Sequence, residues 1–478
     1  MTFLCRFGEA KSYLKKNLVI IVLILITGMI LLTCRNDTIN YDEFFSMQWS
    51  RMNWKDYIAR LMVDTHPPLH DIFLKAINDI SGGNIYIARL FSAMCAIALF
   101  WTAGLFTRKE FGDKVSIFFI LFLYMNNLMI QKSCEIRMYS LATLLCLANA
   151  IFFYKLIKNP KRSYWIGFVC FGVAAAYTQF FGILCMCFTY IGVLTYFIWK
   201  KEKKQVRNWF IAAAATVVAY LPWVYFAFGQ VVEVSGDFWI EMPTSRLGPL
   251  KEMFTTKYAY SYWIYLAVLV LLTGWTIVDF IIHKDEESFW SLVCALTLWG
   301  VYVIAYLFSY FFQPILLSRY LLMGFAITLL GVSRLVKRVN GLVLTAILLI
   351  ISYLGISMVI HYAQEQFNKN TTAFRLYAEH NIDTDDEIVF VYRNIQHYFE
   401  HFLLYYVPQA KIHGFETLDE MKAYLDDMDS NKSDVSTWIV DFANDEVIDE
   451  LTQIDEITLT DMGEHYISTE GFRLYTVR

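Results

Sequence analysis

The sequence is poor in charged residues, and this excludes an ordinary soluble protein. Asp, Glu, Lys and Arg make up 18% of its 478 residues, whereas soluble domains carry about 25%. Hydrophobic residues account for 57% of the chain and aromatic residues for 17%. They gather in runs that approach the roughly 20 residues needed to cross a bilayer. We therefore expect a polytopic α-helical membrane protein.

Cysteine patterns typical of metal sites are also missing. The nine cysteines include no Cys-x-x-Cys pair and no Cys/His spacing that would form a zinc site. Cys185 and Cys187 are expected to pack within a helix. Cys34 and Cys134 would be able to form a disulfide if both of their loops face the outside.

A cleavage site is absent after the first apolar run, residues 17–33. A basic segment precedes this run, as in a secretory signal, but no Ala-x-Ala-like sequence follows it. Since many more apolar runs come after it, we interpret it as a retained transmembrane helix.

Eleven apolar runs in total are expected to cross the membrane. They cover residues 17–33, 85–106, 115–131, 139–156, 164–180, 182–199, 209–228, 262–282, 289–312, 320–336 and 341–361. With the N-terminus inside, the inner segments hold 20 Lys and Arg residues and the outer loops hold 11. Basic residues accumulate on the cytoplasmic side, so we expect a multi-pass cell-membrane protein with its N-terminus inside and its C-terminus outside.

Charge divides the chain into two predicted domains. Residues 363–478 contain 24 of the 44 acidic residues and 8 of the 40 basic ones, a net charge of −16, and the rest of the chain carries +12. Such asymmetry indicates different surroundings. We expect a transmembrane domain over 1–361, with outer loops 34–84 and 229–261, and an extracytoplasmic soluble α/β domain over 362–478.

The C-terminal domain combines strand and helix patterns. Residues 386–393, 410–415 and 437–442 are short apolar runs with strand character, and helical spacing lies between them. The end of the chain is typical of a hairpin, so we expect a small, largely parallel sheet. No glycine-rich phosphate loop is present, and we expect no nucleic-acid partner.

Several chemically active side chains fall on the predicted outer face. The first are Asp42 and Glu43 in "YDEFFSMQW", where neighbouring aromatics would desolvate a carboxylate and raise its pKa. Residues 46–63 after them have the pattern of an interfacial helix. A general base that activates a hydroxyl suits this place, although a solvated loop with two acids would look the same.

His66 lies in "THPPLH", where paired prolines stiffen the backbone and keep it out of helix. A rigid turn explains the prolines, and contact of His66 with substrate is a second role. His66, His70 and Asp42 would be able to bind a metal, but their spacing is not specific for one.

Two further motifs carry arginines. Glu135 and Arg137 in "EIRMYS" follow a predicted span, and ionisable groups at such depth either pair with each other or bind a ligand. Arg319 in "QPILLSRYLL" stands between two long apolar runs. An arginine there can hold a phosphate through two parallel hydrogen bonds or extend to the interface to reach water.

The order of these motifs resembles that of the GT-C membrane glycosyltransferases. It consists of an acidic pair after the first helix, then D-x-H-P-P-L, "ARLFSAM", E-x-R-x-Y-S and P-x-x-x-S-R-Y-L. Within that superfamily it resembles the protein O-mannosyltransferase-like branch (glycosyltransferase family 39) and the bacterial aminoarabinose transferases. The resemblance covers residues 1–361.

The resemblance implies a transferase that uses a polyprenyl-phosphate sugar, on undecaprenyl phosphate in a bacterium, and works at the outer face of the bilayer. It implies that Asp42 is the base toward the acceptor hydroxyl and that Glu43 supports it. The implied substrate-binding residues are His66, Glu135, Arg137, Tyr139, Arg319 and Tyr320, with the two arginines on the donor phosphate. Some relatives use a divalent metal, and the lack of a D-x-D here leaves metal dependence open.

Two other functions fit part of the pattern. A transporter or lipid flippase would also keep ionisable residues in the membrane, but no internal repeat is visible and the charged motifs gather on one face. An inactive relative that serves as a scaffold would retain the same motifs. The acceptor, whether lipid, protein or cell-wall polymer, and the sugar are not specified by the sequence.

Overall fold

The computed structural model describes residues 2–35, 38–234, 240, 242, 245–255, 261–368, 371–384, 386–391, 397–429, 436–442, 451, 459–467 and 470–477. Contacts divide the chain into two units. The helical unit comprises Met1–Arg35 and Ser46–Tyr362, and the sheet unit comprises Asn36–Phe45 and Ala363–Arg478. Each unit is described by itself.

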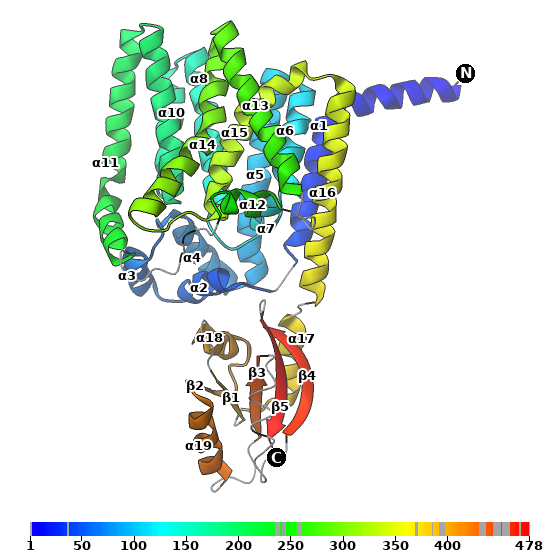
Figure 1. Cartoon of the computed structure of the whole chain (residues 1–478), viewed down its shortest axis with the longest axis vertical. Helices are drawn as coiled ribbons and strands as arrows, with labels where there is room; N and C mark the ends of the chain where they lie inside the picture. Colours follow the sequence, from blue (N-terminus) through cyan, green and yellow to red (C-terminus); the bar gives the residue numbers. More distant parts are fainter. Residues whose placement is uncertain are drawn as a thin grey trace. The chain divides into compact units, whose positions relative to one another are not determined.

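The helical unit is built from long apolar helices that lie side by side (Figure 1). They are α1 (Thr2–Thr33), α5 (Ile85–Phe111), α6 (Asp113–Tyr124), α8 (Tyr139–Lys158), α9 (Arg162–Ala176), α10 (Phe180–Trp199), α11 (Lys203–Val234), α13 (Ser261–His283), α14 (Glu286–Phe311), α15 (Leu322–Ser333) and α16 (Gly341–Asn368). Among the described residues, eight helical segments are long and apolar enough to cross a membrane. A polytopic helical membrane protein is thereby confirmed. Eleven crossings and their orientation stay a prediction.

The predicted helix over residues 115–131 is wrong as a single element. It consists of α6 and the short α7 (Asn127–Lys132), with a break at Asn126. The Asn126 side chain accepts a hydrogen bond from the Met129 N–H at 3.3 Å and donates one to the Met253 carbonyl at 3.0 Å. An asparagine that caps a helix in this way starts a new helix within an apolar run.

The helix α15 forms the centre of the bundle. It lies between two 3₁₀ turns, η1 (Ser318–Leu321) and η2 (Arg334–Arg338), and every residue of α15 is buried. Gly331 allows α14 to approach, because a Cβ at this position would lie 2.5 Å from the Cβ of Cys294. The Ser291 hydroxyl also donates to the Gly331 carbonyl at 2.6 Å. This core holds η1, and with it Arg319, in place.

Short helices surround one end of the bundle. They are α3 (Trp54–Val63), α4 (Leu69–Ser81), α7 and α12 (Gly248–Phe254) (Figure 1). The predicted interfacial helix over residues 46–63 is instead divided between α2 (Tyr41–Trp49) and α3, and Asn53 caps the start of α3. The predicted outer loop 229–261 contains α12, but its residues 235–239, 241, 243–244 and 256–260 lie outside the described residues.

The sheet unit contains a five-stranded sheet of order β2-β1-β3-β5-β4. Its elements are α17 (Thr371–Asn381), β1 (Glu387–Val391), α18 (His397–Tyr406), β2 (Lys411–Phe415), α19 (Leu418–Asp429), β3 (Thr437–Asp441), β4 (Leu459–Ile467) and β5 (Glu470–Val477). The predicted strands and terminal hairpin are confirmed. The predicted largely parallel sheet is wrong: β1 is parallel to β2 and β3, but β5 is antiparallel to β3 and β4, because the hairpin joins the sheet through its second strand.

Both faces of the sheet are packed. On one face, Val389 and Ile439 form an apolar cluster with Met421 of α19. On the other face, the Phe399 ring of α18 lies 5.7 Å from Phe390 and 5.5 Å from Phe472. Strands buried on both sides have continuous apolar runs, which is the pattern seen in "EIVFV" and "TWIVD".

Candidate active site

The acid pair lies in the first turn of α2. The Glu43 carboxylate accepts a hydrogen bond from the Asn40 N–H at 3.0 Å, and the Asn40 side chain accepts one from the Glu43 N–H at 2.9 Å. This reciprocal arrangement is a capping box. Glu43 is buried and Asp42 is half-buried. Glu43 therefore fixes the start of the helix that carries Asp42.

The segment between α3 and α4 holds His66 rigidly within the helical unit. Pro67 and Pro68 are buried, and the next residue, Leu69, donates its N–H to the Tyr177 carbonyl at 2.8 Å. The His66 Nδ1 atom lies 3.0 Å from the Thr65 hydroxyl and 3.9 Å from an Asp64 carboxylate oxygen. The predicted rigid turn is confirmed.

Asp64 and Asp71 lie on either side of the two prolines, and sequence analysis did not single them out. The His70 Nδ1 atom is 3.4 Å from Asp71, whose backbone carbonyl accepts a hydrogen bond from Tyr57 at 2.9 Å. Both acids are visible in the sequence "DTHPPLHD", on either side of the two prolines. Only the fold shows that they face a common cation, because the charge of Arg137 acts on both carboxylates.

The two carboxyls have opposite pKa shifts. Burial, and then the nearby charge of Asp71, raise the pKa of Asp64 to about 6. Burial also raises the pKa of Asp71, but its hydrogen bond with His70 and the positive charges of His70 and Arg137 outweigh this effect. The net pKa of Asp71 therefore lies below its ordinary value. Two acids with separated pKa values are typical of functional sites.

Arg137 follows α7 in a buried segment. Its Nη1 donates to the Ser46 hydroxyl at 2.8 Å, and its side chain is 9% exposed. Glu135 forms its ion pair with Lys132, so the alternative of a mutual Glu135–Arg137 ion pair is wrong. Lys132 was not singled out by the sequence, and it also lies 5.4 Å from the Tyr139 ring.

Tyr139 connects the two arginine motifs. Its ring centroid is 6.4 Å from that of Tyr320, and the Arg319 guanidinium lies 5.8 Å from the Tyr320 ring. The charges of Arg319 and Arg137 both act on the Tyr139 hydroxyl, which is buried and has no hydrogen-bond partner among the described residues. Motifs distant in sequence thus meet at one tyrosine.

A cavity of about 570 Å³ lies next to this cluster. It is lined by Thr65, His66, Gln179, Phe180, Phe181, Gln230, Ile240, Phe308, Phe311, Phe312, Gln313, Ile315 and Tyr320. Two predicted site residues, His66 and Tyr320, are therefore on its wall, and the Phe181 ring is 5.1 Å from Tyr320. Most of the wall is apolar and aromatic, with glutamine amides as the main polar groups.

Side chains suited to a metal do not cluster in the described part of the chain. No group of three or more His, Cys, Asp or Glu side chains there is arranged to hold an ion. Asp42 and Glu43 belong to the sheet unit by their contacts, while His66, Glu135, Arg137, Tyr139, Arg319 and Tyr320 belong to the helical unit.

Comparison with known proteins agrees with this architecture. Residues 65–226 match the family model described as dolichyl-phosphate-mannose-protein mannosyltransferase. No curated protein sequence matches the chain. Two crystal structures of ArnT from Cupriavidus metallidurans are similar in fold. The apo structure has a TM-score of 0.59 at 11% identity and covers 98% of both chains. The undecaprenyl phosphate complex has a TM-score of 0.56 at 12% identity, also over 98% of both chains.

The chain therefore has the fold of the ArnT structures. The family-model match covers residues 65–226, about a third of the 478 residues.

Proposed function

We propose that the protein transfers a sugar from a polyprenyl-phosphate donor to an acceptor hydroxyl on the outer face of the membrane. Undecaprenyl phosphate is the proposed lipid, since a structure of the same fold was solved with that molecule bound. The observation that carries the proposal is the approach of the Tyr139 and Tyr320 rings to 6.4 Å, which brings the two arginine motifs together next to an apolar cavity.

The two arginines suit a lipid phosphate. Charge-assisted hydrogen bonds from guanidinium groups to phosphate are short and strong, and fixed cations stabilise the negative charge that develops on a leaving phosphate. The unpaired Tyr139 hydroxyl, which lies within the field of both cations, is a further hydrogen-bond donor to that phosphate.

The cavity suits the lipid chain. Its phenylalanine wall, which includes the exposed Phe311 and Phe312, would cover the first isoprene units of a polyprenyl chain. His66, on the same wall, would lie near the pyranose or phosphate. Apolar walls with few polar groups are typical of small-molecule sites.

The proposed reaction is a displacement with inversion. The acceptor oxygen attacks the anomeric carbon, the bond from that carbon to the phosphate oxygen breaks, and polyprenyl phosphate leaves. Asp42 takes the hydroxyl proton as general base. Asp42 lies in the first turn of α2, and Glu43 holds the start of that helix.

The transfer assay tests this proposal. Purified protein receives a panel of undecaprenyl-phosphate sugars with cell-envelope acceptor, with and without divalent cations, and release of undecaprenyl phosphate is measured. We expect release from one donor. Loss of a charged hydrogen bond costs about 1.5–3 kcal/mol, so Arg319→Lys, which removes bidentate binding, should lower kcat/KM about 10- to 100-fold, and Asp42→Asn should abolish transfer.

Matched controls are available at the same end of the bundle. Arg246 and Glu252 are exposed, and Arg246→Lys and Glu252→Gln should leave the rate unchanged. Full activity in Asp42→Asn would assign the base elsewhere, with Asp64→Asn as the next variant. No release from any donor would favour a transporter or an inactive scaffold.

A further inference from the structure

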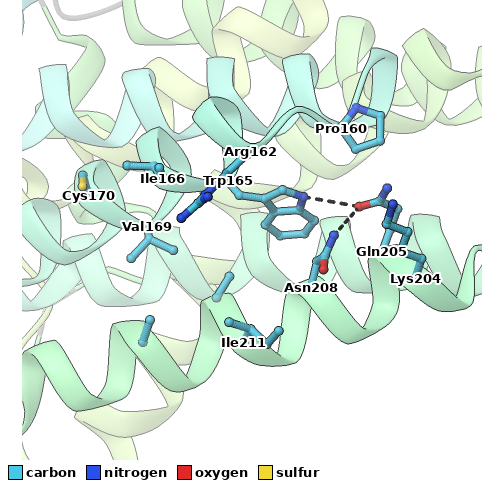
Figure 2. Close-up of a pocket in the computed structure, with 12 residues that line it drawn as sticks. Pro160, Arg162, Trp165, Ile166, Val169, Cys170, Lys204, Gln205, Asn208 and Ile211 are labelled. Atoms are coloured by element: carbon cyan, nitrogen blue, oxygen red, sulfur yellow. Dashed lines mark hydrogen bonds between the residues drawn. The ribbon is translucent and has the colours of Figure 1, made fainter.

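A second cavity lies far from the candidate active site. It has a volume of about 560 Å³ and lies between α9 and the first half of α11 (Figure 2). The opposite end of α11 approaches α3, where Gln230 donates to the Leu61 carbonyl at 3.4 Å. Since a helix rises about 1.5 Å per residue, the groove and the candidate active site lie at opposite ends of the bundle. We call this cavity the α9–α11 groove.

Polar side chains line one part of the groove. The Gln205 side-chain oxygen accepts hydrogen bonds from Asn208 at 2.9 Å and from the Trp165 indole at 3.4 Å (Figure 2). These bonds orient both amides. They leave the Gln205 amide N–H groups without a partner among the described residues, ready to donate to an incoming oxygen.

Two cations line the groove, Lys204 beside Gln205 and Arg162 on the other side of Trp165 (Figure 2). Arg162 begins α9 and Lys204 lies in the first turn of α11, and both line the cavity. Neither forms an ion pair within the described part of the chain. In the two connecting segments, 155–163 and 200–208, nine residues are Lys or Arg and only Glu202 is acidic. The segments beside the groove therefore carry an excess of positive charge.

The remaining wall is apolar. Ile166 and Ile211 are 55% and 61% exposed, and Val169 and Ala215 also line the cavity. An exposed isoleucine on a membrane helix contacts lipid chains. The groove thus combines cations and a hydrogen-bonding amide with an apolar wall, which is the chemistry of one phospholipid molecule.

We propose that the α9–α11 groove binds an anionic glycerophospholipid of the adjacent leaflet. Lys204 binds its phosphate, Gln205 donates to a phosphate or glycerol oxygen, and the acyl chain lies along Ile166 and Ile211. Arg162, on the other side of Trp165, adds positive charge to the groove. Basic pockets between membrane helices attract anionic headgroups. This site is independent of the proposed transfer reaction.

Native mass spectrometry of the full-length protein in detergent tests the proposal. Phosphatidylglycerol, phosphatidylcholine and undecaprenyl phosphate are titrated separately. We expect phosphatidylglycerol to bind at least ten times more tightly than phosphatidylcholine, and Arg162→Ala/Lys204→Ala to remove that preference. The control Lys109→Ala/Arg207→Ala removes the same charge from residues that do not line the groove, and should keep the preference.

A photoreactive phosphatidylglycerol locates the bound lipid independently of folding effects. We expect its cross-links in the wild-type protein to map to residues 160–170 and 204–215. Cross-links only elsewhere, equal binding of both phospholipids, or equal loss in the control variant would overturn the proposal. Tighter binding of undecaprenyl phosphate, lost in Arg162→Ala/Lys204→Ala, would also overturn it, because the groove would then be a polyprenyl-phosphate site.

Discussion

At the scale of single residues, Asp64 shows how burial changes the pKa of a carboxyl group. Its carboxyl is 12% exposed and lies 3.9 Å from His66. Burial and Asp71 raise its pKa to about 6, against about 3.9 in an unfolded chain. Between about pH 4 and pH 6, the folded protein therefore keeps the carboxyl proton that the unfolded chain loses. The free energy of unfolding falls as the pH rises through this range.

The first prediction follows from this difference. A shift of about two pKa units corresponds to roughly 3 kcal/mol. Asp64→Asn carries no charge to bury, so it should raise the thermal unfolding temperature at pH 8 and leave it nearly unchanged at pH 4. Differential scanning calorimetry in detergent at both pH values measures this, and an equal change at both would contradict the raised pKa.

The residues of the site differ in how far sequence could predict them. Arg137 and Arg319 stood out because charge is rare in apolar surroundings. Lys132 and Ser46 did not, since nothing in their own neighbourhood distinguishes them. Their roles, an ion pair with Glu135 and a bond to Arg137, join separate segments and arise only when the chain folds.

At the scale of elements, apolar runs predicted the helices well, but not their ends. All eleven runs contain helix. The break at Asn126 was missed because one polar residue in an apolar run has little effect on average hydropathy, yet its side chain can cap a backbone. The sheet was predicted strand by strand, while its mixed direction depends on which hairpin strand joins β3.

Two elements also bring cysteines together. Cys34 follows α1 and Cys134 lies between α7 and α8, and their sulfur atoms are 2.9 Å apart. We expect a mild oxidant to join them, which mass spectrometry would detect as one disulfide-linked peptide. Cys134→Ser should lose that peptide. Failure of the wild-type protein to cross-link would contradict the packing of α1 against this segment.

Asp279 of α13 joins that helix to η2. Its carboxylate is fully buried and forms ion pairs with Arg334 and Arg338, and His283 lies 3.1 Å away. Removing one partner of a buried ion pair costs about 3–5 kcal/mol, so Asp279→Asn should destabilise the protein by that amount.

A surface pair provides the control for this measurement. Glu287 is 28% exposed and lies 3.0 Å from Lys158, and such pairs contribute about 1 kcal/mol or less. Denaturation in detergent mixtures should therefore separate Asp279→Asn from Glu287→Gln. Equal destabilisation would mean that the Asp279 cluster contributes no more than a surface contact.

At the scale of the whole molecule, the prediction concerns the orientation of the chain in the membrane. The distribution of Lys and Arg predicts that the N-terminus is inside and the C-terminus outside. A cysteine added after Arg478 should react with a membrane-impermeant maleimide in intact cells. A cysteine added at the N-terminus should react only after permeabilisation, and the reverse result would invert the orientation.

Because the site is built from distant segments, its residues are synthesised at different times. Tyr139 enters the membrane early, but Arg319 and Tyr320 are synthesised only after most of the helical bundle. A nascent chain that ends before η1 lacks one cation and one wall of the cavity. If the proposed function holds, ribosome-bound or prematurely terminated chains that end before η1 should therefore bind no lipid phosphate.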